Sequence, residues 1–329
     1  MRYLITGGAG FIGSHLCDAL TRAGHEVLVL DDLSTGRLEN IEHLLGDGRV
    51  AFAEGSADDA QLVDGCMREA DICLHLASAV GVQLVVDSPL ETLLEHVRGT
   101  DVVMAAAARH RRRVLFTSTS EVYGKSSGAL DEDADLVLGS PARSRWSYAI
   151  AKSFGEAVAH AYHDEHGTET IVVRLFNTVG PRQTGRYGMV LPRFVTQALD
   201  HQSLTVYGDG SQTRCFTHVS DTVRALTLLA ENDGAVGNTY NIGSSIPVAV
   251  EDLARRIIAR TGSSSRIERV PYDEAYAAGF EELGSRRPVT TALETLTGWK
   301  PLRTIDAAID DVIAYQRSDQ AHDLMAHAA

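Results

Sequence analysis

The chain has 329 residues, of which 44% are hydrophobic and 22% charged, a composition typical of a soluble globular protein with one large unit or two lobes. Its net charge of −14 argues against nucleic-acid binding, and no apolar run is long enough to span a membrane. The chain enters an expected strand at once, leaving no room for a signal peptide, and its cysteines lack disulfide or zinc spacing. We therefore expect a cytoplasmic protein without metal, with reduced thiols at Cys17, Cys66, Cys73 and Cys215.

The N-terminal segment has the pattern of a β-α-β unit, with strands expected over residues 2–6 and 25–30 and a helix over 14–23. Three glycines between strand and helix permit a tight turn, the close approach of a pyrophosphate and close helix–sheet packing. Asp31 follows the second strand, where a carboxylate can hold ribose hydroxyls and would repel the 2′-phosphate of NADP. The cofactor predicted is NAD, with contacts expected from Gly7, Gly10, Phe11, Ile12, Gly13, Asp31, Asp32, Ser56 and Ala77.

Strands and helices continue to alternate up to residue 176, which predicts an α/β fold with a doubly wound parallel sheet of the Rossmann type. The small residues Ala77 to Ala79 would let a cofactor lie against the backbone. Two long helices carry many apolar residues that look exposed, so a homodimer through them is a hypothesis. The strands are expected over residues 50–53, 71–76, 114–119 and 169–176, and the long helices over 89–109 and 146–166.

The alternation breaks after Asn177, and the shorter elements that follow predict a smaller α/β lobe over the carboxyl edge of the sheet. We expect an NAD-binding domain over residues 1–178, with return segments near 213–242, and a nucleotide-sugar-binding lobe over 179–329 that ends in a frayed tail from 321 to 329. The short elements are expected at 190–200, 204–207, 214–218, 221–231, 239–242, 250–261 and 266–270.

Two polar clusters indicate catalysis. The strand over 114–119 turns polar at Thr119, Ser120 and Glu121, as strands do at a ligand-binding edge. Tyr148 and Lys152 lie four residues apart on an expected helix, and a cation beside a phenol favours phenolate, a general base. Alone, the first cluster could cap a helix and the second could lie on the surface. Together, behind a dinucleotide fingerprint, they favour an active site.

Several motifs together resemble those of the extended short-chain dehydrogenases/reductases that act on nucleotide sugars, the NAD-dependent epimerase/dehydratase family. The resemblance runs from Met1 to about Gln316. Ser118–Gly124 and Leu204–Phe216 look like the UDP-glucuronate decarboxylase (UDP-xylose synthase) branch. The 4,6-dehydratases carry Asp-Glu where this chain has Ser120-Glu121, and the 4-epimerases usually lack the acid. The motifs are Thr6-Gly7-x-x-Gly10-x-x-Gly13, Tyr148-x-x-x-Lys152, Arg174-Leu175-Phe176-Asn177, Gly180-Pro181-Arg182 and Gly298-Trp299-Lys300-Pro301.

The resemblance implies an enzyme that oxidises C4 of a UDP-sugar, with Tyr148 taking the 4-hydroxyl proton as hydride passes to NAD. Lys152 would hold the nicotinamide ribose and lower the pKa of Tyr148, and Thr119 would hydrogen-bond the 4-oxygen. Ser120 and Glu121 would lie beside C5 and its carboxylate, with Arg214 near the carboxylate or a phosphate. The diphosphate candidates are Asn177, Arg193 and Arg286, and the uracil candidate is Tyr207, which plain core packing would explain equally well.

Two enzymatic functions remain open from the sequence. The first is UDP-glucuronate decarboxylation, giving UDP-xylose, UDP-4-keto-pentose or both, and the second is 4-epimerisation of UDP-glucose and UDP-galactose. A dinucleotide sensor without catalysis is disfavoured because the chain keeps Tyr148 and Lys152. Three positions depart from the family: His96 replaces an asparagine, Ser56 an aspartate near the adenine and Val289 an aspartate after Arg286-Arg287-Pro288. We interpret His96 as a satisfied core polar residue.

Overall fold

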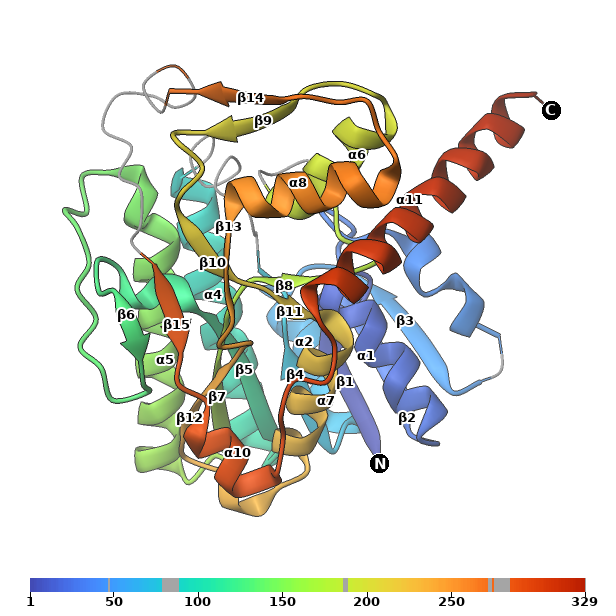
Figure 1. Ribbon diagram of the computed structural model, residues 1–329. Helices are drawn as coiled ribbons and strands as arrows, with labels where there is room; N and C mark the ends of the chain where they lie inside the picture. Colours follow the sequence, from blue (N-terminus) through green and yellow to red (C-terminus); the bar gives the residue numbers. More distant parts are fainter. Residues whose placement is uncertain (47, 79–88, 186–188, 272–273, 275–284, 329) are drawn as a thin grey trace.

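A seven-stranded parallel sheet forms the centre of the computed structural model, which describes residues 1–329 except 47, 79–88, 186–188, 272–273, 275–284 and 329 (Figure 1). The strand order β12-β7-β5-β4-β1-β2-β3 confirms the predicted doubly wound sheet. Every neighbouring pair is parallel. The strands are β1 (Arg2–Thr6), β2 (Glu26–Asp31), β3 (Val50–Glu54), β4 (Ile72–His75), β5 (Arg113–Thr119), β7 (Thr170–Leu175) and β12 (Thr239–Ile242).

Helices cover both faces of this sheet because its strands are apolar on both sides. In β1, Tyr3 and Ile5 pack in one cluster and Leu4 in the other, following the alternation of side chains along a strand. The first face is covered by α1 (Phe11–Arg22), α7 (Val219–Ala230) and α10 (Thr291–Thr297), and the second by α2 (Ala60–Glu69), α4 (Pro89–His110) and α5 (Ser147–His166).

A second apolar core lies beyond the carboxyl edge of the sheet, where Figure 1 shows β9, β14, α6 and α8 stacked together. It is built from α6 (Val190–Leu199), β9 (Leu204–Tyr207), α8 (Val250–Thr261), β14 (Ile267–Val270) and α11 (Ile305–Ala328). Short strand pairs join this part to the sheet: β8 (Thr178–Val179) with β11 (Thr217–His218), β10 (Thr213–Cys215) with β13 (Pro247–Ala249), and β6 (Gly128–Leu130) with β15 (Arg286–Pro288).

The strand order reverses between β1 and β4, which is where a doubly wound sheet opens a crevice for ligands. The segments after β1, β4, β5 and β7 all leave the sheet at this edge. The 3-10 helix η3 (Ser120–Tyr123) directly follows β5, and the other 3-10 helices are η1 (Leu38–Asn40), η2 (Glu42–Leu44), η4 (Ser144–Trp146) and η5 (Asp233–Ala235). The fold therefore gathers residues distant in sequence at one edge.

Several details differ from the sequence predictions. Helix α1 begins at Phe11 rather than Ser14, and α2, α10 and α11 had not been expected. Helix α11 runs to Ala328, through the segment for which a frayed tail was expected. Ala79, named above as a cofactor neighbour, lies outside the described residues. Among the described residues, none of the helices combines the length and apolar character needed to cross a membrane.

Candidate active site

A cavity of about 1100 Å³ lies at the carboxyl edge of the sheet, between the sheet and the second core. Its walls combine the glycine loop, the ends of β2, β4 and β5, and one side of α5 with segments of the C-terminal part. All predicted site residues line it, so the structure brings them together, whereas the ligand of each stays a prediction. They are Gly7, Gly10, Phe11, Ile12, Gly13, Asp31, Asp32, Ser56, Ala77, Thr119, Ser120, Glu121, Tyr148, Lys152, Asn177, Arg193, Tyr207, Arg214 and Arg286.

The glycine loop is closed so tightly that it needs residues without a Cβ. Gly7 has a φ of +73°, and a Cβ there would lie 2.8 Å from the backbone nitrogen of Ala77. A Cβ on Gly13 would lie 2.2 Å from the Gly7 carbonyl oxygen. This packing places the first turn of α1 against the cavity, where its free N–H groups and positive dipole end can meet a pyrophosphate.

Asp31 is a buried carboxylate fixed at the end of β2. It accepts hydrogen bonds from the backbone nitrogens of Ala9 and Leu33, each at 2.9 Å. Burial raises the pKa of Asp31, and these hydrogen bonds oppose the rise. The carboxylate of its neighbour Asp32 accepts hydrogen bonds from the backbone nitrogen and the hydroxyl of Ser34. The closed glycine loop followed by this fixed carboxylate fits the adenosine and pyrophosphate groups of NAD.

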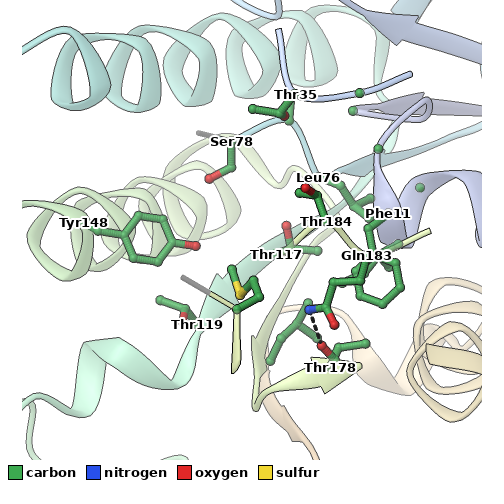
Figure 2. Close-up of a pocket in the computed structure, with 18 of the residues that line it drawn as sticks. Phe11, Thr35, Leu76, Ser78, Thr117, Thr119, Tyr148, Thr178, Gln183 and Thr184 are labelled. Atoms are coloured by element: carbon green, nitrogen blue, oxygen red, sulfur yellow. Dashed lines mark hydrogen bonds between the residues drawn. The ribbon is translucent and has the colours of Figure 1, made fainter. Parts of the chain in front are cut away.

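The polar end of β5 both caps a turn and faces the cavity. The Thr119 hydroxyl accepts from the backbone nitrogen of Glu121 at 3.2 Å, so the capping role considered from the sequence is present. The same residue lies close enough to the Tyr148 phenol to oppose the rise in the pKa of that phenol. Figure 2 shows Thr119 and Ser78 on opposite sides of the Tyr148 hydroxyl, which points into the cavity.

The pKa of Tyr148 differs from what its spacing to Lys152 led us to expect. Burial raises the pKa of Tyr148, and the Glu121 carboxylate adds to the rise, against hydrogen bonds from Ser78 and Thr119. Burial also lowers the pKa of Lys152 to about 7. The Lys152 ammonium donates to the Thr117 carbonyl at 2.9 Å and does not contribute to the pKa of Tyr148. The expected lowering of the Tyr148 pKa by Lys152 is therefore not found, because the amine is directed to the backbone.

Glu121 lies between two arginines. Arg145 is 2.6 Å from its Oε2, and Arg286 donates to its Oε1 at 2.9 Å and to the Ser120 carbonyl at 2.7 Å. Burial favours the neutral acid, but the two guanidinium groups prevail and lower the pKa of Glu121 to about 2. Glu121 is thus ionised at neutral pH. Arg286, for which a diphosphate contact was expected, contacts this carboxylate in the structure.

The remaining predicted residues lie on the C-terminal wall of the cavity. Arg193 donates to the Tyr207 hydroxyl at 2.6 Å, and its guanidinium carbon is 4.6 Å from that ring's centroid. Asn177 donates to the Cys215 carbonyl at 3.3 Å, and Arg214 donates to the Thr213 carbonyl at 2.9 Å. Tyr207 is half-buried and lines the cavity, and it is not among the residues of the second core.

Sequence reasoning missed the part played by Arg145 and Ser78. Arg145 comes three residues before Tyr148, but nothing in its neighbourhood indicates a carboxylate partner. The cavity is rich in cationic side chains although the chain is acidic overall, which favours an anionic ligand. These are Arg37, Arg145, Lys152, Arg182, Arg193, Arg214 and Arg286. Within the described part of the chain, no cluster of His, Cys, Asp or Glu could hold a metal ion.

Comparison with known proteins identifies a family and several relatives that align with nearly the whole chain. A model of the NAD dependent epimerase/dehydratase family matches residues 3–243. A UDP-N-acetyl-alpha-D-glucosaminuronate decarboxylase from Bacillus cytotoxicus is 38% identical over 96% of this chain and 98% of the relative. A UDP-glucuronic acid decarboxylase 1 from Xenopus tropicalis is 35% identical over 98% of this chain and 73% of its own length.

Solved structures with the same fold include enzymes with other names. The UDP-glucuronic acid 4-epimerase from Bacillus cereus, in complex with UDP-glucuronic acid and NAD, is 26% identical, with a TM-score of 0.87 over 97% of this chain and 99% of the other. The dTDP-glucose 4,6-dehydratase DesIV from Streptomyces venezuelae, with NAD bound, is 29% identical, with a TM-score of 0.87 over 98% of both chains.

Proposed function

Because the chain belongs to the NAD-dependent epimerase/dehydratase family of extended short-chain dehydrogenases/reductases, we propose that it is an NAD-dependent UDP-glucuronic acid decarboxylase. The reaction would oxidise C4 of the sugar, release CO2 from C5 and give UDP-xylose, UDP-4-keto-pentose or both. The observation that carries the proposal is the ionised Glu121 between two arginines, beside Thr119 and Tyr148 in one cavity. The decarboxylase names of relatives that align with nearly the whole chain support it.

The first step is removal of the C4 hydroxyl proton by Tyr148. When bound, NAD would supply the acceptor for the C4 hydride and, where the pentose is the product, the source of the hydride returned to C4. Thr119 and Ser78 flank the phenol, which points into the cavity. The Lys152 ammonium, fixed by Thr117, is available to the nicotinamide ribose. These residues align one proton acceptor with one reacting carbon.

Loss of CO2 follows from the chemistry of the C4 ketone. The C5 carboxylate is β to that ketone, so breaking the C5–carboxylate bond leaves an enolate on the C4 oxygen. Thr119 and Tyr148 donate hydrogen bonds to this oxygen and stabilise its developing charge. Glu121 cannot donate a proton at neutral pH because its pKa is about 2. We assign it the role of fixed negative charge beside C5, which favours departure of the substrate carboxylate.

The arginines allow an anionic sugar to approach Glu121. Arg145 and Arg286 together carry one more charge than the carboxylate between them, so the group is net cationic. Arg214 lines the same cavity and can meet either the sugar carboxylate or a phosphate. We propose the diphosphate near Asn177 and Arg193 and the uracil near Tyr207, all on the C-terminal wall.

A 4-epimerase is the second candidate. It needs the same Tyr148 and Lys152, together with space for the keto-sugar to turn. The likeness in fold to the Bacillus cereus UDP-glucuronic acid 4-epimerase and to a UDP-glucose 4-epimerase from Thermotoga maritima favours it. The identities of 26% are lower than those of the decarboxylases, and the ionised Glu121 has no evident task in epimerisation.

The deciding experiment is a product panel. Purified protein with NAD is incubated separately with UDP-glucuronic acid, with its 2-acetamido counterpart and with UDP-glucose, and the products are analysed by mass spectrometry. The proposal predicts loss of CO2 from a uronic acid substrate and no reaction of UDP-glucose. Tyr148→Phe should abolish turnover while leaving NAD bound. Formation of UDP-galactose or a 4-epimeric uronic acid without CO2 would replace the decarboxylase by the epimerase.

Three broader features belong to the same proposal. We propose a homodimer through α4 and α5, supported by exposed Leu94 and Phe154 on these helices. We propose a cytoplasmic location, which the four free, buried cysteines support. We also propose that residues 1–178, with returning β12 and α7, bind NAD and that residues 179–329 supply the sugar-nucleotide contacts, in keeping with their separate apolar cores.

A further inference from the structure

We propose that His96 exchanges a proton with Tyr148 through the hydroxyl of Ser78, so that the catalytic phenol has a built-in proton acceptor on α4. The proposal rests on one part of the proposed function, the removal of the C4 hydroxyl proton by Tyr148. Decarboxylation and 4-epimerisation share that step, so the proposal does not depend on which product forms.

The three side chains come from three separate segments and meet at one corner of the cavity. His96 is on α4 and is 7% exposed, Ser78 follows β4, and Tyr148 begins α5. Ser78 Oγ lies 3.2 Å from His96 Nε2, and Ser78 is close enough to the Tyr148 phenol to oppose the rise in its pKa. The imidazole and phenol rings themselves are 5.4 Å apart between centroids, at 54°. Figure 2 shows the Ser78 hydroxyl directed toward Tyr148.

This geometry changes the interpretation of His96. The sequence suggested only a satisfied core residue where relatives carry asparagine. An asparagine amide does not titrate, whereas an imidazole gains and loses a proton near neutral pH. His96 Nε2 lies beside Ser78 Oγ, so the Ser78 hydroxyl is the single group between the imidazole and the Tyr148 phenol. The substitution therefore adds an acid–base group behind the catalytic phenol.

The proton step is balanced without any other reactant. The Tyr148 O–H bond breaks as its proton moves to Ser78 Oγ, and the original Ser78 proton moves to His96 Nε2. Tyr148 becomes a phenolate, Ser78 remains a hydroxyl and His96 becomes an imidazolium, with no change in electrons. The step needs the imidazole tautomer whose proton is on Nδ1. The reverse transfer restores the phenol.

A relay is useful here because the surroundings of Tyr148 oppose its ionisation. Burial and the Glu121 carboxylate both raise the pKa of the phenol. An imidazolium formed next to the phenolate offsets that cost by attraction at short range. Other titratable side chains at this corner are Lys152 on α5, His75 at the end of β4, Asp58 in the segment beside Gly99, and Glu95 on α4 itself.

The first test needs no substrate. In the NAD-bound protein, the imidazole resonances of His96 are assigned by their loss in His96→Asn and titrated by NMR. Because coupled groups share their titration, Ser78→Ala and Tyr148→Phe should each shift the His96 midpoint by about one pH unit. His160, on α5 and paired with Thr239, is the internal control and should not shift. An unchanged His96 midpoint in both variants would overturn the relay whatever reaction the enzyme catalyses.

The second test follows NADH formation in a single turnover across the pH range, with whichever UDP-sugar the product panel identifies. The wild-type rate should fall at low pH, where a protonated imidazole accepts no proton. His96→Asn and Ser78→Ala should both lose that limb and be roughly tenfold slower at neutral pH, less than the 10²–10⁴ typical of removing the base itself.

The double variant His96→Asn/Ser78→Ala should be no slower than either single variant. Each single substitution already interrupts the same proton transfer from Tyr148 through Ser78 to His96. His160→Asn is the matched histidine control and should keep the wild-type profile. A uniform loss of rate with the wild-type pH profile intact would show that His96 only supports packing. If His96→Asn does not fold, Ser78→Ala alone tests the proposal. A loss of rate at low pH that persists in Ser78→Ala would refute proton transfer through Ser78.

Discussion

Glu121 draws its partners from distant parts of the chain, and its charge depends on both of them. Arg145 lies just before α5, and Arg286 lies 165 residues after Glu121. With one guanidinium removed, the low-dielectric surroundings would favour the neutral acid, and the pKa of Glu121 would rise. The charge of this side chain is therefore a property of the fold and not of the local sequence.

Replacing Arg145 tests that charge. We expect Arg145→Gln to lose about 1.5–3 kcal/mol of stability, as for other charge-assisted hydrogen bonds, and to lower kcat. A further loss of rate should appear on the acid side of the pH–rate profile, separate from the His96 limb, as Glu121 becomes easier to protonate. Arg145→Lys should restore part of the rate, and Arg143→Gln, at an exposed site two residues earlier, should change neither quantity. Wild-type kinetics in Arg145→Gln would remove this arginine from the site.

Glu121 also makes stability depend on pH. Its pKa in the folded protein is about 2, below the 4.5 of a free side chain, so the folded state binds fewer protons than the unfolded state between these values. The stabilisation is complete above about pH 4.5 and disappears as pH falls toward 2. We expect Glu121→Gln to flatten the decline of the melting temperature across this window. Parallel melting curves for variant and wild type would contradict the assigned charge.

The sequence predicted the residues of the site better than their contacts. Tyr148 and Lys152 were found because one turn of helix brings them together, and Thr119 because its strand ends there. The contact of Glu121 with Arg286 was not predicted, since it depends on pairing β15 with β6. His96 was noticed but assigned to the core, because only the folded segment after β4 brings Ser78 to its imidazole.

At the scale of elements, α5 must lie close to β5 to bring Tyr148 and Lys152 to the cavity. Gly155 makes this possible, since a Cβ there would lie 2.4 Å from the ring of Phe116 on β5. The Lys152 amine lies 5.0 Å from the centroid of the same ring. The absence of a side chain at Gly155 therefore sets the depth at which the catalytic helix sits.

Adding one methyl group tests this packing. Gly155→Ala should displace α5 from β5, costing about 1–3 kcal/mol of stability, as overpacking does, and lowering kcat together with NAD affinity. Gly65→Ala is the matched control on α2, where an added Cβ meets nothing within 4 Å. It should gain up to about 1 kcal/mol from helix propensity and leave activity unchanged. Urea unfolding and steady-state kinetics measure both effects, and equal behaviour of the two variants would refute the proposed role of Gly155.

Elements with strong local patterns were predicted more closely than their connections. The limits of β12 and α8 agree with the structure, since alternation and helical periodicity mark them clearly. Helix α2 was missed, although Asp59 caps it through Gln61 and Leu62, as a cap motif would suggest. The pairing of β14 with β9 was not predicted, because it joins strands about 60 residues apart whose partners no local pattern specifies.

At the scale of the whole molecule, α4 and α5 expose three large apolar side chains. Leu90 and Leu94 on α4 are 70% and 40% exposed, and Phe154 on α5 is 44% exposed. The two helices pack against each other, so these side chains lie on adjacent elements. Contact between two copies would bury them and would also fix the helix that carries Tyr148 and Lys152.

Light scattering of the purified protein at micromolar concentration tests this arrangement. We expect a dimer mass for the wild type and a monomer mass for Phe154→Glu, because a charge at the centre of an apolar contact stays hydrated only if the copies separate. Leu302→Glu, at a 74% exposed leucine outside both helices, should remain a dimer. A wild-type monomer would exclude the dimer, and a dimer that survives Phe154→Glu would place the contact on another surface. Because a stable interface buries roughly 800 Å² on each partner, both helices must contribute along much of their length.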